Sequence, residues 1–188
     1  MRRRLTMTKT AVPAALLALG LLAGCGSGTG IPTPPPRAPC PSAGILSDAA
    51  DLTRYRAGAA ADISTTELEA RIVGLDRRCD FAPRNAGLEV TVRVRVQAQR
   101  GPALAGTSAR IPYFVAVTDR EENRVFSRGT DAVTVNLPRN GTGDSVLGEE
   151  ISVLIPGDPN VAATRRIVVG FVLTPEEVAL NRRRGPRS

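Results

Sequence analysis

The chain has 188 residues and a formal charge of +7, with no histidine and with Lys9 as its only lysine. These absences exclude Ser-His-Asp and Cys-His nucleophile systems, His-ligated zinc and non-haem iron sites, and any Schiff-base or P-loop lysine beyond residue 9. Between residues 25 and 181 there are 17 basic and 18 acidic residues, and only 3% of the chain is aromatic, so we expect no nucleic-acid partner.

The first 25 residues combine a basic start with a short apolar stretch. Arg2, Arg3, Arg4 and Lys9 precede the apolar residues 11–23. Thirteen helical residues extend about 20 Å, which is too short for a hydrocarbon core of about 30 Å. The small residues Ala23 and Gly24 lie just before Cys25, as at the cleavage site of an exported precursor.

The run Leu22-Ala23-Gly24-Cys25 resembles the end of a bacterial lipoprotein signal sequence. The resemblance implies cleavage after residue 24, acylation of Cys25 and stable anchoring in a membrane by more than one acyl chain. Gly26 in place of aspartate is similar to the pattern of lipoproteins sent to the outer membrane of Gram-negative cells. An ordinary secretory signal with an incidental cysteine is the alternative.

Residues 25–41 form a predicted tether. The segment holds six prolines between Pro32 and Pro41 and has no apolar periodicity, so we expect it to separate a domain at 42–183 from the anchor. Once Cys25 is acylated, Cys40 and Cys79 remain as an even pair in an oxidising compartment, which favours a disulfide over two free thiols.

Several segments of the body show the period of two that is typical of strands. The clearest is residues 88–99, where valines alternate with polar side chains. Residues 67–76 fit both a strand and a helix, and we predict a strand because Gly74 interrupts a helix. The remaining predicted strands cover residues 113–118, 133–137, 151–156 and 167–173, the last of them apolar enough to be buried on both faces.

The chain ends with a predicted short helix. Thr174 is a suitable cap, Pro175 suits the first helical position, and Glu176 and Glu177 lie at the positive end of the helix. The helix is expected to reach about residue 183, with 184–188 as a basic tail. About seven strands with one terminal helix predict an all-β fold, an antiparallel immunoglobulin- or fibronectin-like β-sandwich, with a small barrel as the alternative.

The body also resembles uncharacterised immunoglobulin-like envelope lipoproteins of arginine-rich bacteria. The residues that carry this resemblance are 112–117, with the sequence PYFVAV, and 169–177, with the sequence VGFVLTPEE. The resemblance implies a fold and no reaction.

One polar row stands out as a candidate binding face. Arg93, Arg95, Gln97 and Gln99 occupy alternate positions of the predicted strand, so they project from one face about 6.6 Å apart. Such a row suits carboxylates of a partner or an acidic glycan. A solvated face is the alternative, since arginine also discourages strand aggregation.

Other charged clusters favour simpler interpretations. Asp119, Glu121, Glu122 and Asn123 have oxygen ligands but no ligand loop, so we expect a turn and no metal or cofactor. A hydrolase would need two opposed carboxylates, for which Asp144, Glu149 and Glu150 are the candidates. Arginines 182–184 either contact anionic head groups or belong to a frayed end.

These observations predict a class of function. We expect a non-enzymatic interaction or scaffolding module, lipid-anchored on the periplasmic face of the outer membrane, with an envelope protein as partner. A glycan- or peptidoglycan-binding domain that uses the row of residues 93–99 is the first alternative, and a carboxylate-based hydrolase is the second.

Overall fold

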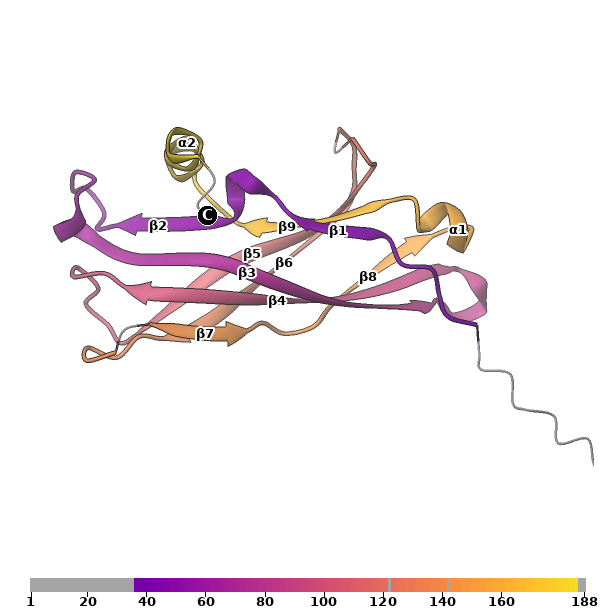
Figure 1. Ribbon diagram of the computed structural model, residues 1–188, viewed down its shortest axis with the longest axis horizontal. Helices are drawn as coiled ribbons and strands as arrows, with labels where there is room; N and C mark the ends of the chain where they lie inside the picture. The colour runs from indigo at the N-terminus through magenta and orange to yellow at the C-terminus, as the bar shows by residue number, and fades with distance from the viewer. Residues whose placement is uncertain (1–35, 122, 142, 186–188) are drawn as a thin grey trace, which may run out of the picture. The chain divides into compact units, whose positions relative to one another are not determined.

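A computed structural model of the chain describes residues 36–121, 123–141 and 143–185 (Figure 1). Cys25 and residues 1–35 lie outside the described residues. The described part of the chain forms the elements β1 (Ser42–Ile45), η1 (Ser47–Ala49), β2 (Asp51–Tyr55), η2 (Ile63–Thr65), β3 (Thr66–Phe81), η3 (Pro83–Asn85), β4 (Gly87–Arg100), β5 (Ser108–Thr118), β6 (Val125–Asn136), β7 (Asp144–Leu147), β8 (Ile151–Pro156), α1 (Pro159–Ala162), β9 (Arg166–Phe171) and α2 (Pro175–Arg184).

The strands form two sheets. The four-stranded sheet has the order β1-β9-β5-β6, and the five-stranded sheet has the order β2-β3-β4-β7, with β8 pairing the first half of β4. The two sheets pack face to face, which confirms the predicted β-sandwich (Figure 1).

One pair of strands departs from the predicted antiparallel arrangement. β1 pairs with β9 in parallel, with Ser42 opposite Arg166 and Ile45 opposite Val169. The reason is topological, because β1 and β9 both run away from the same end of the sandwich. The chain reaches that end twice, once from residues 36–41 and once through α1. A parallel pair joins segments far apart in sequence, so local periodicity cannot reveal it.

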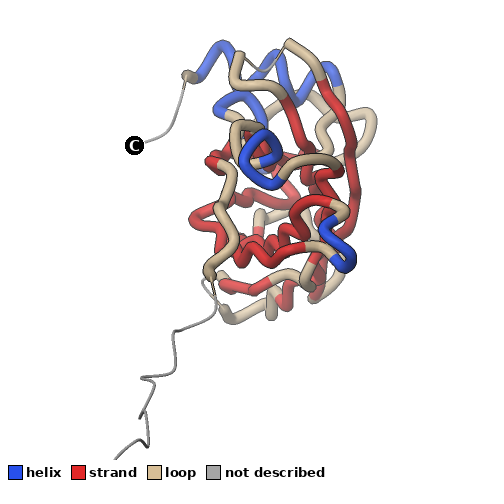
Figure 2. Tube along the Cα trace, turned by 90° about the vertical axis from the view of Figure 1, so that its right-hand side faces the viewer, coloured by secondary structure: helices blue, strands red, loops and turns tan. Residues whose placement is uncertain are grey.

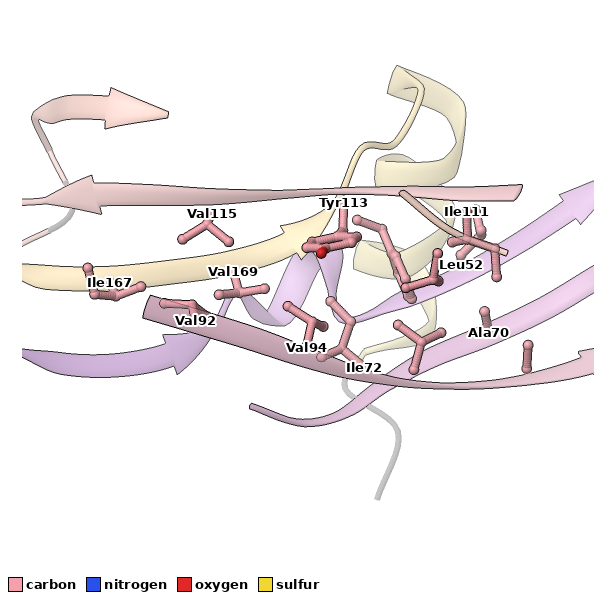
Figure 3. Packing of buried hydrophobic residues seen from close by; sticks show 14 of the residues in the cluster. Leu52, Ala70, Ile72, Val92, Val94, Ile111, Tyr113, Val115, Ile167 and Val169 are labelled. Atoms are coloured by element: carbon pink, nitrogen blue, oxygen red, sulfur yellow. The ribbon is translucent and has the colours of Figure 1, made fainter. Parts of the chain in front are cut away.

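The core lies between the sheets and follows from the alternation along β4. Its inward side chains, from Leu88 to Ala98, are almost completely buried. They meet Tyr113 and Val115 of β5 and Ile167 and Val169 of β9 from the facing sheet (Figure 3). Tyr113 and Phe171 are the largest side chains in this core.

The ambiguous segment at residues 67–76 is a strand, as predicted. It belongs to β3, which pairs with β4 from Leu68–Arg100 to Phe81–Leu88. The register shifts between Ile72 and Gly74, so that Val73 is an extra residue on β3. Because of this bulge, core-facing and outward-facing side chains alternate regularly before and after Val73. Ile72 and Leu75 therefore both lie on the core side although they are three residues apart.

The terminal helix α2 begins at the predicted cap and packs through polar contacts. The Thr174 hydroxyl accepts a hydrogen bond from Glu177 N, and the Glu177 carboxylate accepts one from Thr174 N. The buried Asn181 amide donates to the backbone oxygens of Asp48 and Asp51. Because Asn181 bridges η1 and β2, the helix is fixed to the edge of the sandwich.

The helix ends one residue later than predicted and is not frayed. Arg182 Nε lies 2.7 Å from Asp48 Oδ2, and Arg184 donates to Thr53 Oγ1 and to the Tyr55 hydroxyl. Arg184 therefore belongs to the folded domain. Residues 186–188 of the predicted basic tail lie outside the described residues.

The two ends of the sandwich differ in what they carry. At the first end lie the start of β1, the β3–β4 turn, the β5–β6 loop and α1. We call this the tether end, because residues 36–41 lead into it; Figure 2 views the domain from this side. The far end carries the β2–β3, β4–β5 and β6–β7 connections (Figure 1), and Arg184 at the end of α2 lies beside them. No helix in the described residues is both long and apolar enough to span a membrane.

Candidate functional site

The predicted polar row lies on the outer face of the five-stranded sheet. Arg95, Gln97 and Gln99 are exposed, and Arg93 is partly buried. All of them project from β4, which is held between β3 on one side and β7 and β8 on the other. The sequence pattern therefore predicted the direction of these side chains correctly.

The two arginines of this row have carboxylate partners in the same chain. Arg93 Nη2 lies 2.6 Å from Glu150 Oε1, and Arg95 Nη2 lies 3.5 Å from Asp76 Oδ2. On the same face Arg71 pairs with Asp51 at 2.9 Å. A carboxylate from a partner would have to compete with these internal carboxylates, which the sequence pattern did not predict.

The row does not converge on one concave site. Arg93 lines a hollow of about 130 Å³ together with Asp76, Arg77, Arg78, Thr91 and Glu150. Gln99 lines a separate hollow of about 370 Å³ at the far end, beside Arg100 and Arg184. The first hollow is small and of mixed charge, so it suits a polar contact better than an enclosed ligand.

The ion pairs of this face make a testable contribution to stability. Arg93→Glu with Arg95→Glu replaces two attractions by two repulsions, and exposed pairs are worth about 0.2–1 kcal/mol each. We expect the free energy of unfolding in urea to fall by about 1–2 kcal/mol at low salt, and by less in 1 M salt. Adding Asp76→Arg and Glu150→Arg should recover the loss. Equal stability of the double and the quadruple variants would contradict the pairing.

A larger hollow at the tether end was not predicted from the sequence. It measures about 500 Å³ and is lined by Cys40, Ser42, Arg120, Ala163, Thr164, Arg165 and Arg166. These residues come from the start of β1, the β5–β6 loop and the turn between α1 and β9. Because they are distant in sequence and follow no periodic pattern, only the fold brings them together.

Each arginine of this hollow is positioned by a neighbouring group. Arg120 Nε donates to the Thr164 backbone oxygen at 3.3 Å. The Arg165 guanidinium lies 4.0 Å from the centre of the Phe126 ring, in a cation–π contact. The Arg166 guanidinium lies against Gly44. A Cβ atom at residue 44 would be only 3.0 Å from Arg166 Nη2.

The predicted disulfide between Cys40 and Cys79 is present, with the two Cα atoms 5.5 Å apart. It joins the segment just before β1 to Cys79 near the end of β3, and therefore links the two sheets at the tether end. Cys79 also packs against the core.

The candidate carboxylates of a hydrolase are not brought together. Asp144 lies opposite Ala98 and accepts a hydrogen bond from Asn136 N, whereas Glu150 pairs with Arg93. Five residues along β4 separate those positions, a distance of about 17 Å. Glu149 and Glu150 are both exposed.

The acidic residues near position 119 form a turn. Asp119 Oδ1 accepts a hydrogen bond from Asn123 N. Across the described ranges, no group of three or more acidic, cysteine or histidine side chains could hold a metal ion.

One buried titratable group lies between the sheets. The Tyr113 hydroxyl is 3.4 Å from Asp131 Oδ2 and 3.4 Å from the Glu149 backbone oxygen. Gly148 leaves room for it, since a Cβ atom there would lie 2.9 Å from the hydroxyl oxygen. Burial, together with the carboxylates of Asp131 and Glu149, raises the pKa of Tyr113 to about 12.

The raised pKa predicts a loss of stability in alkali. An unfolded tyrosine ionises near pH 10, about 2 units lower, so the folded state favours the neutral phenol. This stabilisation is complete below about pH 10 and is lost as the pH rises to about 12, by about 2–3 kcal/mol. Urea unfolding at several pH values should show the fall in the wild type and not in Tyr113→Phe. In the Tyr55→Phe variant, Tyr113 is the only tyrosine. The change in absorbance that accompanies ionisation of its phenol should therefore occur near pH 12.

Comparison of the chain with protein-family models, with characterised proteins and with solved structures finds no match. Its function must therefore be inferred from its own residues.

Proposed function

We propose that this protein is a lipid-anchored protein of the bacterial cell envelope whose β-sandwich acts as a non-enzymatic interaction module. The observation that carries the proposal is the run Leu22-Ala23-Gly24-Cys25 after a basic and apolar start. Acylation of Cys25 would place the folded domain at the end of a proline-rich tether, on the periplasmic face of the outer membrane.

The attachment of the tether to the domain supports this proposal. Cys40 lies at the point where the proline-rich segment meets the sandwich, and its disulfide to Cys79 joins that point to the β3–β4 hairpin. Disulfides persist in oxidising compartments such as the periplasm. In an anchored domain, such a link transmits forces on the tether to the β3–β4 hairpin rather than to the edge strand β1 alone.

Replacement of Cys25 tests the anchor. In Cys25→Ser we expect an unlipidated precursor without acyl mass, whereas the wild type should carry acyl mass on residue 25. Mass spectrometry of the two purified proteins measures this directly. A wild-type protein without acyl mass, or one that retains residues 1–24, would refute the anchor.

The finer features of the fold and of the binding face belong to the same proposal. We favour an immunoglobulin- or fibronectin-like relationship, which the two packed sheets support, although the β2-β3-β4 meander is not part of the usual strand order.

A second candidate function is glycan binding by the outer face of the five-stranded sheet, because Arg95, Gln97 and Gln99 are exposed there. Sedimentation with purified peptidoglycan, compared between the wild type and Gln97→Ala with Gln99→Ala, separates the two roles.

A further inference from the structure

The strand β8 forms an open edge of the five-stranded sheet. It pairs with β4 through residues 151–156, and no strand among the described residues pairs with its other side. Proteins commonly protect such edges with charged side chains. The edge strand β6 of the facing sheet carries Arg128 and Asp131, whereas the sequence of β8, ISVLIP, contains no charged residue. The edge of β8 therefore lacks this protection.

The hydrogen bond from Gly157 N to Ala86 O fixes the direction of the backbone groups of β8. Gly157 and Ala86 flank the opposed residues Gly87 and Pro156, so these two form a non-hydrogen-bonded pair. Hydrogen-bonded and non-hydrogen-bonded pairs alternate along an antiparallel ladder. The N–H and C=O groups of the odd-numbered residues of β8 therefore point to β4, and those of the even-numbered residues point to the open edge.

The open edge thus presents the N–H and C=O groups of Ser152 and Leu154. Pro156 adds only a carbonyl group, because proline has no N–H. The side chains of Ser152 and Leu154 are exposed, and Leu154 reaches an exposure of 53%. An extended segment that lies beside β8 can exchange main-chain hydrogen bonds with these groups, as in β-strand addition.

A second copy of β8 fits this edge. When Val153 lies opposite its own copy in an antiparallel pair, Ser152 lies opposite Leu154 of the second copy, and the two residues exchange both hydrogen bonds. Two-fold symmetry repeats this pair, so four hydrogen bonds form and every edge group of residues 152 and 154 is used. A shift by two residues would place Pro156 opposite Ser152, whose carbonyl group would then have no donor.

The side chains are also complementary in this register. On the core-facing side Ile151 lies opposite Ile155 of the second copy, and the two Val153 side chains lie opposite each other. Opposed β-branched side chains stabilise strand pairs. No like charges oppose each other within the paired strands, because β8 has no charged residue. These features favour a second copy of this chain as the occupant of the edge.

We propose that β8 pairs with β8 of a second copy of this chain, in antiparallel register about Val153, and joins two five-stranded sheets into one. A pair of short strands is marginally stable in water, so the dimer is a weak one that depends on concentration. Copies confined to one membrane, as in the proposed function, would meet at a raised local concentration. The pairing itself does not require the anchor.

Sedimentation equilibrium of the full-length protein in detergent measures the association. We expect the mean mass of the wild type to rise from monomer toward dimer as the concentration increases. Leu154→Pro removes an amide that faces the open edge and not β4, so the fold should persist. It deletes two of the four hydrogen bonds of the dimer, and the association should weaken by at least about 10-fold.

Leu154→Lys and Ile63→Lys form a matched pair of further variants. Both replace an exposed apolar side chain by lysine, one on β8 and the other at the far end. Lysine on an edge strand opposes the addition of another strand, so Leu154→Lys should also associate more weakly than the wild type. Ile63→Lys should associate like the wild type. Circular dichroism melting verifies that the three variants are folded.

Disulfide crosslinking tests the register. A mixture of Ser152→Cys protein and Leu154→Cys protein should form a crosslinked dimer on mild oxidation, because the two Cα atoms lie about 5.5 Å apart in the proposed pair. Either variant alone places its two new thiols on residues about 7–8 Å apart, beyond the usual range of a disulfide. The oxidised wild type, in which Cys40 is bonded to Cys79, measures the background from Cys25.

The proposal would be overturned by a wild type that stays monomeric at every concentration, or by equal association of the wild type and both variants at residue 154. Equal crosslinking in the mixture and in the single variants would refute the register about Val153. A monomer that binds a synthetic ISVLIP peptide, and loses this binding in Leu154→Pro, would assign the edge to an extended segment of another protein. Association of a wild type without acyl mass would refute the anchor and leave the pairing in place.

Discussion

Removal of the disulfide by Cys40→Ala with Cys79→Ala should lower the free energy of unfolding by about 4 kcal/mol, since the bridge closes a loop with a sequence separation of 39 residues. The unfolded chain regains the freedom that the bridge restricts, and Cys79 also loses part of its contact with the core. For a domain of this size the melting temperature should fall by about 8–16 °C.

Thermal unfolding followed by circular dichroism measures this change. The wild type treated with a reducing agent should melt close to the double variant, which controls for the loss of the sulfur atoms themselves. A melting temperature within about 3 °C of the oxidised wild type would show that the bridge contributes little to stability.

Gly87→Ala should destabilise the tether end strongly. Gly87 has a φ of +141°, and a Cβ atom there would lie 2.1 Å from the Ile155 backbone oxygen and 2.9 Å from Pro156 Cα. Both contacts are with the backbone of β8, so a flexible side chain cannot relieve them. Backbone strain and overpacking together are expected to cost about 3–5 kcal/mol, measured by urea unfolding.

Gly157 provides the matched control for this substitution. It also has a positive φ, of +107°, but nothing lies within 4 Å of its would-be Cβ atom. Its amide donates to the Ala86 backbone oxygen, so it lies in the same part of the fold as Gly87. Gly157→Ala should cost only the backbone strain, about 1–2 kcal/mol. Equal effects at the two positions would refute the close approach of β4 and β8.

Elements governed by local patterns could be predicted from the sequence. The alternation in residues 88–99 defined the buried and exposed faces of β4, and the cap at Thr174 defined the start of α2. The pairing of Cys40 with Cys79 followed from the number of cysteines and from the oxidising compartment that the resemblance of residues 1–25 implies. Each of these depends on neighbouring residues or on composition, which a single sequence contains.

Features that depend on distant segments could not be predicted in this way. The parallel pairing of β1 with β9 joins residues more than 120 positions apart. The short strands β1 and β2 have too few residues for a clear period of two. The internal partners of Arg93 and Arg95, and the hollow around Arg120 and Arg165, likewise depend on register and on loop packing. Only a three-dimensional arrangement reveals them.

The position of the bridge just ahead of β1 also has a mechanical consequence. Among the described strands, β1 is an edge strand that pairs with β9 alone, so a pull on the N-terminal segment would by itself shear these hydrogen bonds. Because Cys40 is bonded to Cys79 before β1 begins, the load passes into the long β3–β4 ladder and β1 carries almost none of it. A stretched tether in an oxidising compartment would thus leave the edge strand intact, whereas the reduced protein would lose β1 first.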